Sequence, residues 1–137
     1  MKKFEILEHI SDLKIRVFGR TKKELFENAM LGMFEGAKYE KSVDVKHREI
    51  KVKIKIKSVD LSSLLVDFLS EVLYLVETKK LVFEKVEFQK FTETEIEATL
   101  IGFPLKRIGV QIKGVTFHDL NIRKEKDIWQ AEILFDI

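Results

Sequence analysis

The chain alternates between segments with strand-like and segments with helix-like spacing of apolar residues. Residues 13–19 (LKIRVFG) and 49–58 (EIKVKIKIKS) alternate apolar with polar or basic side chains, a period of two typical of half-buried strands. In the second of these, Ile50, Val52, Ile54 and Ile56 are expected to face the core, and Lys51, Lys53, Lys55 and Lys57 to face water. Further strands are predicted over residues 81–91, 94–103, 107–123 and 128–137, with a turn at 124–127.

Two other segments repeat apolar residues at helical spacing, and each begins with a capping signal. Thr21 followed by Glu24 forms a capping box for a first helix that ends near Gly36. Asp60 is a suitable N-cap for a second helix, expected to run to about Glu77 and to be the central core helix. The apolar positions are Leu25, Phe26, Ala29, Met30, Met33 and Phe34 in the first helix, and Leu61, Leu64, Leu65, Phe68, Val72, Leu75 and Val76 in the second.

The order of these elements predicts the fold class. A β-α-β-α order followed by four more strands is typical of an α+β protein. We expect a two-layer arrangement, with two helices packed on one side of a mixed or antiparallel sheet. At 137 residues the chain has the length of one domain, so residues 1–137 are expected to form a single domain around one core.

Composition narrows the chemistry that is available to the protein. The absence of cysteine excludes disulfides, thiolate nucleophiles and Cys-ligated zinc, so any metal must be held by carboxylate, carbonyl or imidazole groups. Hard cations are therefore favoured. No window is apolar enough to span a bilayer and the N-terminal stretch lacks a signal-peptide pattern, so a cytoplasmic protein without membrane contact is expected.

The lysine series at 51, 53, 55 and 57 has two interpretations. It can be the solvated face of a strand, whose charges also discourage edge-to-edge aggregation. Alternatively, its ammonium groups recur about every 7 Å and could follow the phosphates of an RNA. The net charge of +2 is too balanced for a protein that binds nucleic acid on its own, which favours the solvated face.

No known catalytic template is present, so the protein is not expected to be an enzyme. The chain lacks a phosphate-binding loop, a dinucleotide fingerprint, a metalloprotease helix and a nucleophile elbow. His9 precedes Ser11 and Asp12, but residues so close in sequence seldom form a catalytic triad. Four other residues are functional candidates that also have a structural interpretation. His118 can lie at the edge of the core, and Asp67 and Glu71 can be exposed on a helix surface. Trp129 can be an aromatic residue at the rim of the core or an anchor for a partner.

Acidic residues at both ends of the chain are the remaining chemical signal. Asp12 begins the first long strand, and Asp136 lies beside the α-carboxylate of Ile137 where the last strand stops. If those strand ends are neighbours, three carboxylates converge and repel one another unless a hard divalent cation neutralises them. The alternative is two unrelated surface acids.

Three separated blocks carry a resemblance to a known family. The stretches EHISDLKIRVFGRTKKELFENAMLGMFEG, LLVDFLSEVLYLVET and IKGVTFHDLNIRKEKDIWQAEILFDI resemble the archease family. The likeness covers nearly the whole chain. Where the family usually reads His-Thr-Ala-Asp, this chain has His9, Ile10, Ser11 and Asp12, so the acid is kept and the two middle residues differ.

The resemblance implies a function. Archeases are non-enzymatic cofactors of the RtcB-type RNA ligase of tRNA splicing and RNA repair, and they promote ligase guanylylation from GTP and multiple turnover. The family's metal positions match Asp12, Asp136 and Ile137, with calcium as the associated ion, and Lys113 matches a lysine linked to activation. RNA would then be reached only through the ligase. Two other functions stay open, a metal-dependent phosphoester hydrolase and a small RNA-binding module.

Overall fold

The computed structural model describes residues 1–7, 11–42, 49–117 and 120–137. These residues form two helices and nine strands. In chain order the elements are β1 (Phe4–Leu7), β2 (Asp12–Gly19), α1 (Lys22–Ala37), β3 (Tyr39–Lys41), β4 (Ile50–Lys57), α2 (Leu61–Lys79), β5 (Leu81–Phe91), β6 (Glu95–Ile108), β7 (Gly114–Thr116), β8 (Arg123–Glu125) and β9 (Ile128–Asp136). The two helices and most of the long strands lie where the sequence predicts them, but β6 continues through Pro104 to Ile108 instead of ending at residue 103, and the short strands β1 and β3 are additional.

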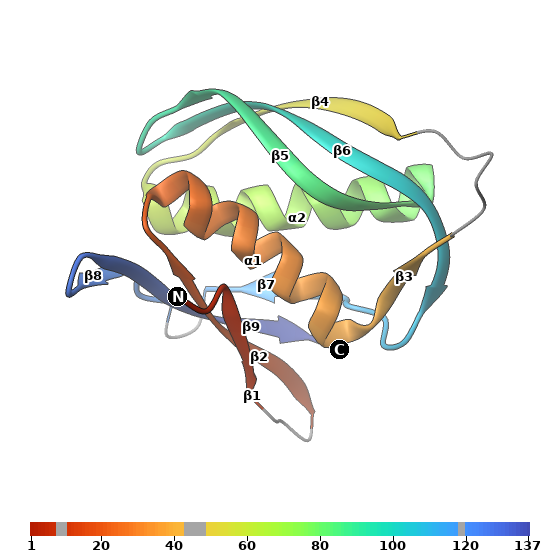
Figure 1. Cartoon of the computed structure of the whole chain (residues 1–137), viewed down its shortest axis with the longest axis horizontal. Coiled ribbons are helices and arrows are strands. Elements are labelled where there is room, and N and C mark those ends of the chain that lie inside the picture. Colours follow the sequence, from red (N-terminus) through yellow and green to blue (C-terminus); the bar gives the residue numbers. More distant parts are fainter. Residues whose placement is uncertain (8–10, 43–48, 118–119) are drawn as a thin grey trace.

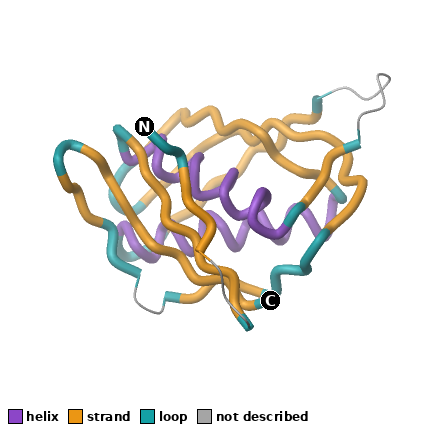
Figure 2. Tube along the Cα trace, turned by 60° about the horizontal axis from the view of Figure 1, so that its bottom comes forward, coloured by secondary structure: helices purple, strands orange, loops and turns teal. Residues whose placement is uncertain are grey.

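The strands form two antiparallel sheets. One sheet has the order β1-β2-β9-β7, with β8 also paired to β9, and the other has the order β3-β6-β4, with β5 also paired to β6. Both helices run between the two sheets, as Figure 1 shows from one side and Figure 2 from a view turned by 60°. The α+β class and the packing of two helices against antiparallel strands are confirmed. The expected two-layer arrangement differs, because the strands divide into two sheets and make three layers.

The apolar surface of α2 explains why one sheet is not enough to cover it. Leu64, Leu65 and Val66 are consecutive and all buried, and three consecutive residues span about 200° of a helix circumference. A helix that is apolar around most of its circumference must be covered on more than one side. The remaining buried positions of α2 are Phe68, Leu69, Val72, Leu73, Leu75 and Val76.

Both helix starts use the caps that the sequence predicts. The Thr21 hydroxyl accepts a hydrogen bond from the Glu24 amide at 3.1 Å, while the Glu24 carboxylate bonds to the Arg20 amide at 3.4 Å instead of the Thr21 amide. The Asp60 carboxylate accepts from the Ser63 amide at 2.7 Å. Side-chain oxygens thus satisfy amides that the first helical turn leaves without a partner.

The Asp60 cap is expected to make stability depend on pH in the acid range. The Ser63 amide holds the pKa of Asp60 below its usual value of 3.8. The pKa of Asp60 is therefore lower in the folded protein than in the unfolded chain. The ionised cap stabilises the fold fully above the unfolded-state pKa, and this stabilisation is lost as the pH falls through the lowered pKa of the folded protein. The melting temperature of the wild type should therefore fall more steeply than that of Asp60→Asn in titrations from about pH 5 to about pH 2. Identical slopes would contradict this role, and Thr21→Ser, at a cap that does not titrate, is the matched control.

Two predicted strands differ in detail from the structure. In β4, Ile54 and Ile56 are buried as expected, but Ile50 at the start of the strand is 40% exposed, so the inward face covers only the second half. The predicted strand over 107–123 is wrong for most of its length: among its described residues, 107–108 are the end of β6, and otherwise only β7 and the first residue of β8 are strand. Residues 109–113 instead bond to the end of α1 and to β9.

Candidate metal centre at the ends of β2 and β9

The register of β2 and β9 brings Asp12 and Asp136 together. The two strands pair along their whole length, with Asp12 directly opposite Asp136 and Leu13 opposite Phe135. Directly opposite residues of an antiparallel pair point to the same face, with Cβ atoms about 4.5–5.5 Å apart. Leu13 and Phe135 are buried on the face toward α1, so the two aspartates lie on the outer face. The condition set by the sequence, that these strand ends be neighbours, is met.

Ile137 continues β9 directly beyond Asp136. Its side chain is partly buried against the core and lines a cavity of about 230 Å³ together with Asp12, Leu13 and Ala37. The side chain is thus anchored next to Asp12. Its α-carboxylate, at the last residue of the sequence, follows one residue after the Asp136 side chain.

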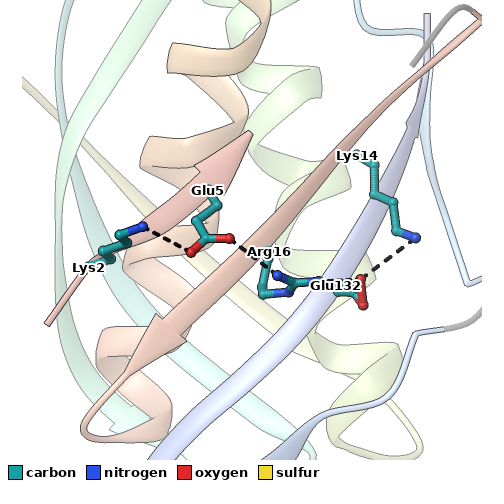
Figure 3. Close-up of polar contacts among 5 residues, drawn as sticks. All are labelled: Lys2, Glu5, Lys14, Arg16 and Glu132. Carbon is teal, nitrogen blue, oxygen red and sulfur yellow. Dashed lines mark hydrogen bonds and ion pairs between the residues drawn. The ribbon is translucent and has the colours of Figure 1, made fainter. Parts of the chain in front are cut away.

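Most other charged groups on this face are neutralised by cross-strand partners. Arg16 lies between two carboxylates, 3.2 Å from Glu5 and 3.3 Å from Glu132, and Figure 3 shows the row these side chains form. Lys2 adds a contact of 3.2 Å to Glu5, and Lys14 one of 3.7 Å to Glu132. The acids in the middle of the sheet therefore need no external cation.

The Asp12 and Asp136 carboxylates have no such partner. Within the described residues, neither side chain has an ion pair or a hydrogen bond. Like charges directly opposite each other destabilise an antiparallel pair. This end of the sheet thus carries negative charge that the described part of the protein leaves uncompensated.

On its other side, Asp136 is held by the segment that leads into β7. The Lys113 amide donates a hydrogen bond of 2.7 Å to the Asp136 carbonyl, and Gly114 lies directly opposite Asp136. Since Gly114 has no side chain, the space beside the carboxylate stays open, and an added Cβ would come no nearer than 3.9 Å to Asp136 Oδ2. The Lys113 side chain itself is exposed. Nothing in the alternation of residues 107–123 indicates that Gly114 faces Asp136.

The donor set fits a hard cation. In the described part of the chain, His, Asp and Glu side chains form no group of three or more that could hold a metal. Among the described residues, Asp12 and Asp136 supply two side-chain carboxylates, and the α-carboxylate of Ile137 is the candidate for a third. Carboxylate oxygens, completed by water, are the ligands that calcium and similar ions prefer.

The remaining sequence candidates are either outside the described residues or have structural roles. His9, His47 and His118 lie outside the described residues. Asp67 is exposed on α2 and accepts a hydrogen bond of 2.5 Å from the Ser58 hydroxyl, which ties the helix to the preceding turn. Trp129 is partly buried with the ammonium groups of Lys22 and Lys124 at 5.0 and 5.8 Å from its ring, so contacts within the chain already occupy it.

The lysine series on β4 is exposed and partly paired. Lys55 and Lys57 form cross-strand ion pairs of 3.6 and 3.5 Å with Glu97 and Glu95. These acids lower the positive charge that a phosphate chain would meet. The structure thus favours a solvated strand face.

The comparisons with known proteins all lead to the same family. The Archease protein family (MTH1598/TM1083) matches residues 4–137. A protein archease of Methanosarcina barkeri is 38% identical, over 99% of this chain and 97% of that protein. The solution structure of Methanobacterium thermoautotrophicum protein 1598 superposes with a TM-score of 0.70 at 27% identity and covers both chains completely. The crystal structure of an archease, possible chaperone, from Thermotoga maritima shares the fold, with a TM-score of 0.68 at 18% identity over 96% of this chain and 94% of its own.

The fold is that of a small α+β protein whose two helices lie between antiparallel sheets. Its candidate site is the pair of acidic residues at the ends of β2 and β9. The family match over nearly the whole sequence makes the assignment more specific: the chain belongs to the archease family. Neither helix of the described structure is both long enough and apolar enough to cross a membrane.

Proposed function

We propose that this archease activates an RtcB-type RNA ligase and is not itself an enzyme. Such a ligase joins an RNA end bearing a 3'-phosphate or 2',3'-cyclic phosphate to a 5'-hydroxyl in tRNA splicing and RNA repair. The archease would promote formation of the ligase-guanylate from GTP and allow repeated turnover in the cytoplasm, reaching RNA only through the ligase. Family membership supports this role, as does the description of the Thermotoga maritima relative as a possible chaperone.

The uncompensated pair of Asp12 and Asp136 is the observation that carries the proposal. These two side chains and the α-carboxylate of Ile137 would hold a divalent cation, calcium being the ion we expect. When bound, the cation supplies positive charge that neutralises the strand ends and can accept an oxygen ligand from a partner. The protein's part is to hold the three carboxylates on rigid strand ends, with the exposed Lys113 beside them to contact the ligase or its nucleotide.

The direct test follows the guanylate adduct on the ligase. Ligase, GTP and Mn²⁺ are mixed with substoichiometric amounts of the archease, and the rate of adduct formation and the number of turnovers are measured. We expect acceleration with the archease and no guanylate adduct on the archease itself. An unchanged rate would reject the proposal. Hydrolysis of a phosphoester by the archease alone would instead support the hydrolase function. Salt-dependent affinity for RNA in the absence of ligase would support the RNA-binding function.

A short extension after Ile137 is expected to remove the stimulation. The extension turns the α-carboxylate into a neutral peptide group and takes away one of three carboxylates, while the buried core is unchanged. The matched control carries the same residues before Met1, at the other end of the chain. Adduct formation and circular dichroism are measured for both proteins. Full stimulation by the C-terminally extended protein would show that the α-carboxylate is not needed.

A further inference from the structure

Residues 109–113 connect the end of α1 to the end of β9. The amides of Gly109 and Val110 each donate a hydrogen bond of 2.9 Å to carbonyls at the end of α1, and the Lys113 amide donates one of 2.7 Å to the Asp136 carbonyl. The Gln111 side chain adds a bond of 3.1 Å to Glu77 on α2. The segment thus holds the Asp136 carbonyl on one side, in addition to the pairing of β9 with β2.

The Tyr39 hydroxyl holds the middle of the segment. It accepts a hydrogen bond of 3.1 Å from the Ile112 amide, directly before Lys113. Tyr39 and Ile112 are only 7% and 2% exposed, and the Tyr39 ring packs on Phe34 with a centroid distance of 5.6 Å. Burial raises the pKa of Tyr39 above its usual value of 10.0, although the Ile112 amide opposes this shift. The hydroxyl therefore stays neutral at physiological pH.

We propose that Tyr39 is a positioning residue for the metal centre and acts through Ile112 and Lys113 on Asp136. Without the hydroxyl, the Ile112 amide is left buried without a partner, which is unfavourable. The segment must then shift to reach another acceptor, and the Lys113 amide moves with it. Asp136 then loses the hydrogen bond from the Lys113 amide that fixes its carbonyl on the side away from β2, so its carboxylate is held less precisely although β9 stays paired with β2. This inference rests on the proposed function, since it concerns the same carboxylates.

Tyr39→Phe tests the inference because it removes the hydroxyl and keeps the ring. Calcium binding is measured by titration calorimetry well below the melting temperature, and ligase stimulation is measured as calcium is raised. We expect calcium affinity to fall about tenfold, the lower end for residues that orient a metal ligand. Stimulation should reach the wild-type plateau at saturating calcium, and hydrogen exchange at the Ile112 amide should accelerate.

Tyr74→Phe on the exposed face of α2 is the matched control and should bind calcium as the wild type does. A purely structural role of Tyr39 would lower the melting temperature and leave calcium affinity unchanged, and that result would overturn the inference. If the wild type binds calcium and stimulates the ligase but Tyr39→Phe behaves identically, only this inference fails. If the wild type does neither, the proposed function fails and the inference with it.

Discussion

Replacing Asp136 with asparagine is expected to abolish both calcium binding and stimulation of the ligase. Asparagine keeps the shape of the side chain and the β-strand backbone but removes one of the two side-chain carboxylates at the end of β2 and β9. The Lys113 amide bonds to the main-chain carbonyl of Asp136 and is unaffected. The loss should therefore be local to the cation, with the fold intact by circular dichroism.

The same substitution should slightly stabilise the protein when no cation is present. Asp12 and Asp136 are directly opposite each other, where like charges are unfavourable, so Asp136→Asn should gain about 0.2–1 kcal/mol. With calcium at about 100 times its dissociation constant, the wild type should gain about 2.7 kcal/mol and Asp136→Asn nothing. The measurement is thermal unfolding in chelator and in calcium.

The control for Asp136→Asn is Asp127→Asn. Asp127 is exposed in the turn before β9, at a φ of 65° that asparagine also tolerates. This variant has the same change in charge but should bind calcium and stimulate the ligase normally. Wild-type calcium binding by Asp136→Asn would exclude Asp136 as a ligand, and a lower stability in chelator would contradict the repulsion.

Phe68→Ala is expected to have the largest effect on stability. Phe68 lies in the middle of α2, is 0% exposed, and its ring lies 5.7 Å from Phe26 and 6.4 Å from Phe88, measured between centroids. It therefore contacts both α1 and β5. Truncating a buried phenylalanine costs about 3–5 kcal/mol because transfer and cavity terms add. Since a typical domain is stable by only about 5–15 kcal/mol, this is a large share of the total.

Chemical denaturation measures the loss for Phe68→Ala, with Tyr74→Ala as the control on the same helix. Tyr74 is 59% exposed, so its truncation should change stability by less than about 0.5 kcal/mol. A small loss for Phe68→Ala, near that of Tyr74→Ala, would show that α2 is not enclosed between the two sheets.

Local patterns explain which elements the sequence predicts well. Helix starts depend on residues within one turn, so Thr21 and Asp60 are recognisable from the chain alone. The number of sheets depends on contacts between distant segments, and period-two alternation is the same in one sheet or two. The consecutive buried residues Leu64, Leu65 and Val66 were the available sign that α2 would be covered on more than one side.

From the sequence, the candidate site could be predicted only on the condition that the strand ends carrying Asp12 and Asp136 are neighbours. Alternation places Asp12 and Asp136 at strand ends, but only the register shows that they are directly opposite. Gly114 could not be connected with them because its place opposite Asp136 depends on the β7–β9 register. Tyr39 could not, because its relation to Asp136 passes through residues 109–113, whose apolar pattern resembled a strand. That pattern reflects the buried Ile112, which packs without strand pairing.

The position of β9 inside its sheet also has a consequence for the order of folding. β9 lies between β2 and β7, and its partner β2 comes from the opposite end of the sequence. Such distant pairings close late, since a long stretch of chain must be ordered before they form. Asp12 and Asp136 therefore come together only when β9 has paired with β2, late in folding. A molecule in which β9 has not yet paired would not present the two acids side by side, so the candidate cation site depends on completed folding.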